Sequence, residues 1–104
     1  MSKLYVVRNG SIYTLSERGG NLGSFRPPYG GSAIFVDYSP NLDRLLVTTE
    51  KGVIHIMSTS GGKYSSFNAT DAVMARWDGD RIIVQFRNGK LTRYSQAGGS
   101  FGSI

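Results

Sequence analysis

The stretch that decides the fold is Arg-Ile-Ile-Val-Gln-Phe-Arg-Asn-Gly-Lys-Leu-Thr-Arg-Tyr-Ser-Gln-Ala-Gly-Gly-Ser-Phe-Gly-Ser-Ile, which forms residues 81–104. The same pattern occurs twice earlier in the chain, 37 and 79 residues before it. At both offsets a turn glycine, a serine and a Gly-Gly pair fall on Gly89, Ser95 and Gly98-Gly99 without a gap. A repeat of this length is one supersecondary unit that stacks on its neighbours, so it determines the architecture of the domain.

Each copy is predicted to consist of short β-strands, because β-branched and aromatic residues lie between turns rich in glycine, proline and asparagine. Arg8-Asn9-Gly10 predicts a two-residue hairpin turn in the first copy. The second and third copies begin with an extra strand that the first copy lacks. The expected strands are residues 4–7, 11–15, 21–25, 33–39, 44–49, 53–57, 63–67, 72–77, 81–86, 90–94 and 100–104. We therefore expect residues 1–104 to form a single all-β repeat domain, with copies at about 3–25, 33–67 and 72–104.

Two all-β architectures are built from units of this size, the β-propeller and the β-trefoil. One strand of each copy is apolar in two adjacent columns, Leu4/Leu46/Ile83 and Tyr5/Val47/Val84. A sheet with one face in water alternates strictly, whereas a sheet between two neighbours can be apolar on both faces. The pattern favours antiparallel, blade-like sheets that stack face to face, with a β-trefoil as the alternative.

A strand that ends in Tyr38-Ser39-Pro40 is followed by a polar turn, an apolar strand, the turn Glu50-Lys51-Gly52 and an alternating strand to Met57. In this order of features, residues 36–57 resemble a blade of WD40-like propeller repeats. The resemblance implies a propeller-like fold of about two and three-quarter blades. The Trp-Asp and Gly-His pairs of that family are absent from the matching positions, and Trp77-Asp78 is expected at a turn, so the family's buried polar network is not carried over.

The free faces of the outer sheets predict self-association. Propellers have about four to eight blades, so three blades cannot close a ring. Met1 suggests that the chain begins naturally. We therefore expect a homo-oligomer, most simply a two-fold dimer of six blades, since closed symmetric assemblies are the usual way to cover such faces.

Composition excludes several classes of protein. The 104 residues include no cysteine, and no apolar run approaches the roughly 18 residues that would span a membrane. The N-terminus does not resemble a signal peptide, so a cytoplasmic protein is expected. Twelve Lys and Arg against seven Asp and Glu give a net charge of +5, and residues 81–104 hold four basic residues and no acidic one. This excess favours anionic partners.

No catalytic or metal-binding arrangement stands out, so we expect neither an enzyme nor a cofactor. His55 is the single histidine, and its column, shared with Tyr13 and Thr92, predicts a half-exposed structural position. Asp78-Gly79-Asp80 lacks the other ligands of a calcium loop and is expected to be a turn. The Gly-Gly pairs lack the following Gly-Lys-Ser/Thr of a phosphate loop and are also turns.

Two sets of residues are candidates for binding. Turns that share one end of the blades, together with an aromatic loop residue, predict a protein-binding surface made of Arg8, Asn9, Tyr29, Lys51, Arg87 and Asn88. Basic residues near aromatic ones predict a nucleic-acid surface made of Arg76, Trp77, Arg81, Arg87, Lys90 and Arg93. The leading hypothesis is a non-catalytic protein–protein interaction module that acts as a homo-oligomer. A nucleic-acid-binding protein and a carbohydrate-binding lectin are the alternatives.

Overall fold

The computed structural model describes residues 3–104, so Met1, from which a natural start was inferred, lies outside them. These residues form eleven β-strands in three antiparallel sheets. The strands are β1 (Leu4–Arg8), β2 (Ser11–Leu15), β3 (Asn21–Phe25), β4 (Ala33–Ser39), β5 (Arg44–Thr49), β6 (Val53–Ser58), β7 (Lys63–Asn68), β8 (Ala72–Asp78), β9 (Arg81–Phe86), β10 (Leu91–Tyr94) and β11 (Ser100–Ser103). Every predicted strand is present, and the ends differ by one residue at most. Asp78, expected in a turn, is the last residue of β8.

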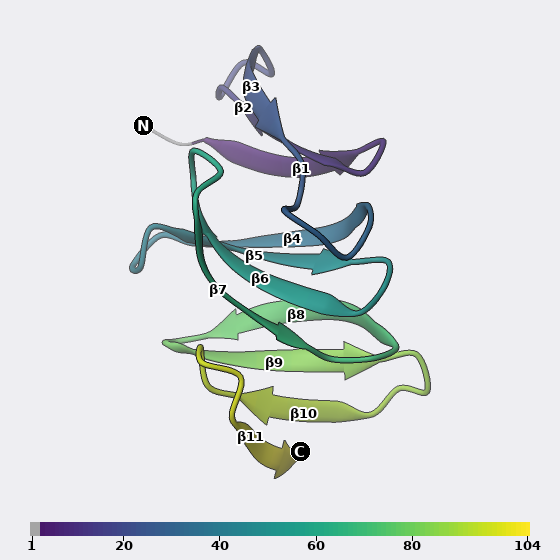
Figure 1. Cartoon of the computed structure of the whole chain (residues 1–104). Coiled ribbons are helices and arrows are strands. Elements are labelled where there is room, and N and C mark those ends of the chain that lie inside the picture. Colours follow the sequence, from purple (N-terminus) through teal and green to yellow (C-terminus); the bar gives the residue numbers. More distant parts are fainter. Residues whose placement is uncertain (1–2) are drawn as a thin grey trace.

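Each sheet is a simple meander of strands that are neighbours in the chain. The first sheet has the order β1-β2-β3, the second β4-β5-β6-β7, and the third β8-β9-β10-β11. Figure 1 shows the three sheets stacked one above another, with the first and third at opposite ends of the stack. This face-to-face stack is the blade arrangement predicted from the sequence, and it is not a β-trefoil.

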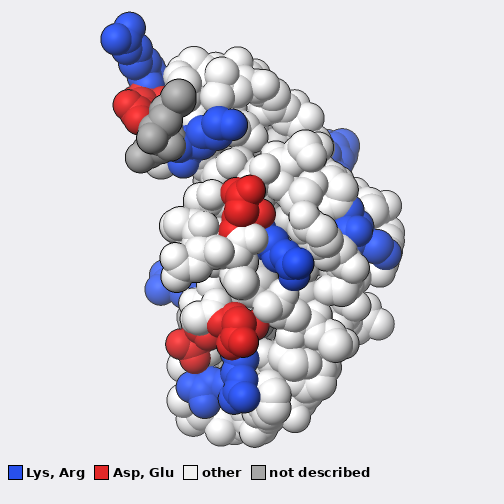
Figure 2. Space-filling view, turned by 90° about the vertical axis from the view of Figure 1, so that its left-hand side faces the viewer, with Lys and Arg blue, Asp and Glu red and all other residues white. Residues whose placement is uncertain are grey.

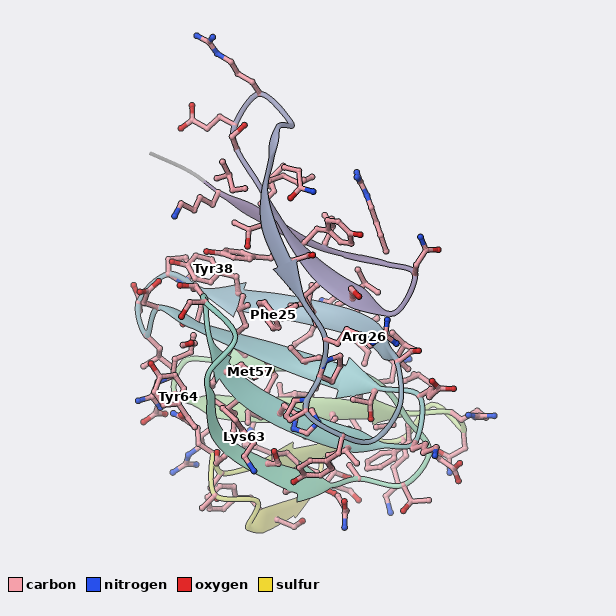
Figure 3. The ribbon with its side chains drawn as sticks, turned by 45° about the horizontal axis from the view of Figure 1, so that its top comes forward. Phe25, Arg26, Tyr38, Met57, Lys63 and Tyr64 are labelled. Carbon is pink, nitrogen blue, oxygen red and sulfur yellow. The ribbon has the colours of Figure 1, made fainter. Side chains whose placement is uncertain are left out.

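The second sheet is buried on both of its faces. Leu45 and Val47 of β5 pack toward the first sheet, whereas Leu46 between them packs toward the third, because successive residues of a strand point to opposite faces. One core cluster, between the first two sheets, contains Ile12, Ala33, Leu45, Val47 and Met57. Phe25 and Tyr38 extend this cluster (Figure 3). The other, between the second and third sheets, contains Leu46, Ile54, Ile56, Ala69, Ala72, Ala75, Ile82 and Val84.

The gapless alignment of the first copy is wrong at β1. Asn9 and Gly10 both have positive φ and form a two-residue turn, so Val7 pairs with Ile12. In the second sheet the turn is longer, and Thr48 pairs with Ile54. The equivalent of Leu46 in the first sheet is therefore Tyr5, and Leu4, which the alignment had placed in that column, is 55 % exposed.

Candidate binding surfaces

Three hairpin turns gather at one end of the stack, which we call the turn end. They are residues 9–10, 50–52 and 87–90, and Figure 1 shows them on its right-hand side. The predicted protein-binding residues Arg8, Asn9, Lys51, Arg87 and Asn88 lie there, and all of them are exposed. Their placement at one end agrees with the expectation from the sequence, and their role in binding stays a prediction.

The connection between β3 and β4, residues 26–32, lies against the turn end. Its Ser32 N–H donates to Glu50 Oε2 (2.6 Å), while the Glu50 N–H donates to the Ser32 carbonyl (2.9 Å). The Lys51 N–H donates to the Gly30 carbonyl (3.2 Å). The Ser32 donor lowers the pKa of Glu50 below its usual value because it stabilises the carboxylate. These bonds fix the loop to the second sheet.

The loop of residues 26–32 packs on His55. Its Nε2 lies 2.8 Å from the Tyr29 carbonyl oxygen, which can only accept, and its Nδ1 lies 2.6 Å from Ser66 Oγ. Nε2 therefore carries a proton and donates to this carbonyl, while Nδ1 can accept from the Ser66 hydroxyl when the ring is neutral. Burial lowers the pKa of His55, in agreement with a neutral ring. The predicted half-exposed position is wrong: His55 is 0 % exposed, because the loop covers it.

Tyr29 presents a fixed aromatic surface. Its ring meets the His55 ring edge-on, with the ring centroids 4.8 Å apart and an interplanar angle of 87°. Lys63 Nζ lies 5.2 Å from the centroid of the Tyr29 ring. Tyr29 is nevertheless 50 % exposed. An aromatic residue that is held on one side and open on the other is suited to bind a partner at a small cost in conformational entropy.

The predicted nucleic-acid residues fall into two separate groups. Arg87 and Lys90 lie at the turn end, whereas Arg76, Trp77, Arg81 and Arg93 lie toward the opposite end, where β8 ends and β9 begins. Arg93 Nε is 3.4 Å from Asp78 Oδ2, and the Arg81 guanidinium lies 4.4 Å above the Phe101 ring. Figure 2 shows that acidic and basic side chains alternate over this opposite end. The structure thus places these residues beside acids and aromatic rings, and nucleic-acid binding stays a prediction.

Trp77 has a packing role that the sequence did not indicate. Its side chain is partly buried against the core between the second and third sheets. Its backbone N–H donates to Asp37 Oδ2 (2.8 Å), which links β8 to β4. Part of the Trp77 side chain is thus covered by the core, and the stacking role that the nucleic-acid hypothesis gives it stays a prediction.

Two hollows lie on the third sheet, and sequence reasoning found neither of them. One, of about 450 Å³, is on the face that points away from the second sheet and is lined by Met74, Arg76, Trp77, Asp78, Ile83, Gln85 and Leu91. The other, of about 720 Å³, opens near the turn end beside Arg87 and Lys90. The connection into the third sheet, residues 69–71, is shorter than the connection into the second sheet, residues 26–32. This difference would have pointed to the hollow near the turn end.

The part of the chain that the structure describes offers no group of three or more His, Cys, Asp or Glu side chains that could hold a metal ion. Within residues 3–104 there is likewise no helix that is long and apolar enough to cross a membrane.

The sequence matches no protein-family model and no curated protein. Solved structures do match. The β-propeller domain of Cps50 (Swd1) from Myceliophteria thermophila is 12 % identical, with a TM-score of 0.72, and the match covers 93 % of this chain and 32 % of that one. Sqt1 from Saccharomyces cerevisiae is 15 % identical with a TM-score of 0.73, and the match covers 97 % of this chain and 30 % of that one.

The structure of BBS1N in complex with ARL6DN is also similar. It is 15 % identical with a TM-score of 0.71, and the match covers 98 % of this chain and 35 % of that one. These neighbours are β-propeller domains, and the chain spans about a third of their length. At this identity the similarity shows the fold.

Proposed function

We propose that this chain, which has the fold of three consecutive β-propeller blades, is a non-catalytic protein-binding module that acts as a homo-oligomer. The similar BBS1N structure is of a complex with another protein, ARL6DN. Such a module binds through exposed faces and turns that a rigid scaffold holds in place. In this chain two kinds of surface support the proposal: the free faces of the outer sheets and the turn end around Tyr29.

The observation that carries the proposal is a pair of apolar side chains on the free face of the third sheet, Ile83 and Leu91, which lie among the polar and charged residues Arg76, Asp78, Gln85 and Arg93. Ile83 and Leu91 occupy the positions that Leu46 and Ile54 occupy in the second sheet, where both are 0 % exposed against the third sheet. On the third sheet the same positions, with Met74 beside them, line the hollow of about 450 Å³. A face with this pattern gains free energy when another sheet covers it, because apolar surface is removed from water.

A second copy of the chain is the partner that fits this face. In the first sheet Ile12 packs toward the second sheet, so Val6 and Tyr13, which pair on the other face, point away from the stack. The third sheet of one copy can pack on this face of the next copy as the second sheet packs on the third. Two copies then form a ring of six blades through two equivalent contacts, within the usual range of about four to eight blades.

Light scattering on the purified protein tests the proposal. We expect a mass twice the 11.3 kDa of one chain, and a loss of the dimer in Ile83→Lys, because Ile83 pairs with Arg76 and Arg93 on the two neighbouring strands and a third cation buried on that face would lack a partner. Leu22→Lys is the matched control, since Leu22 is 57 % exposed on the outer strand β3 and should leave the mass unchanged. A wild-type mass of 11.3 kDa at tens of micromolar protein would overturn the homo-oligomer.

The turn end is the surface that we propose for a different protein. Tyr29 supplies an aromatic anchor with a fixed ring in the loop against the turn end, and the turns there supply exposed polar and basic groups from Arg8, Asn9, Lys51, Arg87 and Asn88. Aromatic residues and arginine are the residue types that most often dominate the binding energy of protein interfaces. Loss of partner binding in Tyr29→Ala, with the oligomer intact, would assign this role.

A further inference from the structure

The second and third sheets correspond residue by residue at an offset of 37. His55 therefore corresponds to Thr92, and Ser66 to Ser103. The connection that enters each sheet is anchored by the same hydrogen bond: the Glu50 N–H donates to the Ser32 carbonyl (2.9 Å), and the Arg87 N–H donates to the Asp71 carbonyl (2.9 Å). The two connections thus end at equivalent points and can be compared directly.

The connections differ in length, and the difference leaves a groove. On the second sheet, residues 26–32 fill the space over His55. Gly30 is so close to the sheet that a β-carbon on it would lie 2.8 Å from Thr49 Oγ1 and from Val53 Cγ2. On the third sheet the connection is only residues 69–71. The equivalent space is the hollow of about 720 Å³, which is lined by Phe86, Thr92, Tyr94 and Ser103, with Arg87 and Lys90 beside them.

The charge at the mouth of this groove is the reverse of that on the second sheet. Glu50, which accepts a hydrogen bond from the Ser32 N–H, is replaced by Arg87. The apolar Val53 is replaced by Lys90. Both basic side chains are exposed, and within residues 3–104 neither has a hydrogen bond or an ion pair. Asp71 also lines the hollow, so a segment in this groove would meet two cations and one carboxylate, a net positive charge, where residues 26–32 meet the carboxylate of Glu50.

The floor of the groove has room for an aromatic ring. Thr92 is smaller than His55, its counterpart under Tyr29, so the space above it is deeper. Tyr94 is held in place because its ring stacks on Phe67, with the ring centroids 4.8 Å apart. Aromatic rings prefer such neighbours to water. On the second sheet the ring of Tyr29 contacts His55, and Ser32, three residues later, is hydrogen-bonded to Glu50 in the turn.

We propose that this groove binds an extended segment of a partner protein that carries an aromatic residue and, about three residues later, a carboxylate. The segment would lie on the third sheet as residues 26–32 lie on the second. The ring would lie over Thr92, and the carboxylate would accept hydrogen bonds from Arg87 and Lys90. The inference rests on the proposed protein-binding function and names the class of partner at the turn end.

Two capped synthetic peptides test the proposal, Pro-Pro-Tyr-Gly-Gly-Glu and Pro-Pro-Tyr-Gly-Gly-Lys, titrated into isotopically labelled protein and followed by NMR. We expect the first to bind with a Kd on the order of 0.1 to 1 mM, as suits a short peptide in an open groove. The Lys peptide should bind about tenfold more weakly, because its charge opposes Arg87 and Lys90. The largest shifts should fall on Thr92 and Ser103.

The variant Arg87→Glu should reverse the preference between the two peptides. Arg18→Glu is the matched control, because Arg18 is exposed in the turn between β2 and β3 of the first sheet, outside the groove, and should leave the preference unchanged. Ser103→Trp, on the exposed edge strand β11, should fill the groove and abolish binding of both peptides. The proposal is overturned if the two peptides bind equally, if neither binds at about 5 mM, or if the shifts lie outside the groove. The mass measurement reports on self-association independently of these titrations.

Discussion

Phe67 occupies the space where a side chain on Gly98 would be. A β-carbon on Gly98 would lie 2.7 Å from the β-carbon of Phe67. Phe25 stands in a similar relation to Gly61, with its Cγ 3.1 Å from the equivalent point. In each case the last strand of one sheet places an aromatic ring over the hairpin turn of the next sheet. The Gly-Gly turns are thus also contacts between blades.

Replacement of these glycines by alanine should show this contact. Gly19, Gly61 and Gly98 all have positive φ, so each substitution strains the backbone at a cost of about 1 kcal/mol. At Gly98 the overlap with Phe67 should add about 1 to 3 kcal/mol to the loss of unfolding free energy. Gly19, which has no atom within 4 Å of its added β-carbon, is the control. Urea denaturation that gave equal losses for Gly19→Ala and Gly98→Ala would contradict the role assigned to Phe67.

The buried His55 should make stability depend on pH. Its pKa is lowered in the folded protein, so the unfolded chain binds a proton more readily. The contribution of the neutral His55 to the free energy of unfolding is therefore fully present above the ordinary pKa of about 6.5. It falls as the pH is lowered through that value toward the folded-state pKa. The loss should be roughly 1.4 kcal/mol for each pH unit over which only the unfolded chain is protonated.

Unfolding free energies measured at several pH values between about 7 and 5 would check this slope. His55→Gln is the control, because an amide can donate to the Tyr29 carbonyl and does not titrate. The wild-type slope should be absent from that variant. A slope that survives in His55→Gln would assign the pH dependence to other groups.

The outer edges of the second and third sheets carry equivalent cation–π pairs. The Arg44 guanidinium lies 4.3 Å from the centroid of the Tyr64 ring, and that of Arg81 lies 4.4 Å from the centroid of the Phe101 ring. A double-mutant cycle with Arg81→Gln and Phe101→Leu should give a coupling of about 0.5 kcal/mol, as expected at an exposed site. A coupling of zero would show that the contact between Arg81 and Phe101 does not help to hold β11 in place.

In urea denaturation, Arg44→Gln should lower the free energy of unfolding more than Arg81→Gln does. Arg44 also donates to Gln96 Oε1 (2.9 Å), and Gln96 Nε2 donates to the Asp80 carbonyl (2.9 Å), so this arginine connects the second sheet to the third. Removal of a hydrogen bond made by a charged group costs about 1.5 to 3 kcal/mol. Equal losses in the two variants would show that the bond to Gln96 contributes little.

The strands, the sheet order and the stacking could be predicted from the sequence because glycine or proline marks every turn except residues 69–71 and the pattern repeats. The register of β1 could not. Arg8-Asn9-Gly10 and Arg87-Asn88-Gly89 are identical in sequence, yet Asn9 has positive φ and Asn88 does not. The first turn, residues 9–10, is shorter than the third, residues 87–90. The pairing of the flanking strands sets this length, rather than the three turn residues themselves.

The candidate site was predicted in outline only. Exposure of Arg8, Lys51 and Arg87 at one end followed from their positions in equivalent turns. The burial of His55 did not, because the loop that covers it comes from residues far away in the chain. The groove on the third sheet was missed for a related reason. It exists because the connection of residues 69–71 is short, and a short connection leaves no characteristic residue in the sequence.

Each sheet is made from one uninterrupted piece of chain, and this bears on how the protein is synthesised. A meander can form its hydrogen bonds as soon as its own residues have left the ribosome, since no strand waits for a distant partner. The second blade emerges when the first is already available to cover one of its two apolar faces. The second and third blades can therefore each cover one of their two faces as soon as they emerge, which reduces the apolar surface exposed to aggregation during translation.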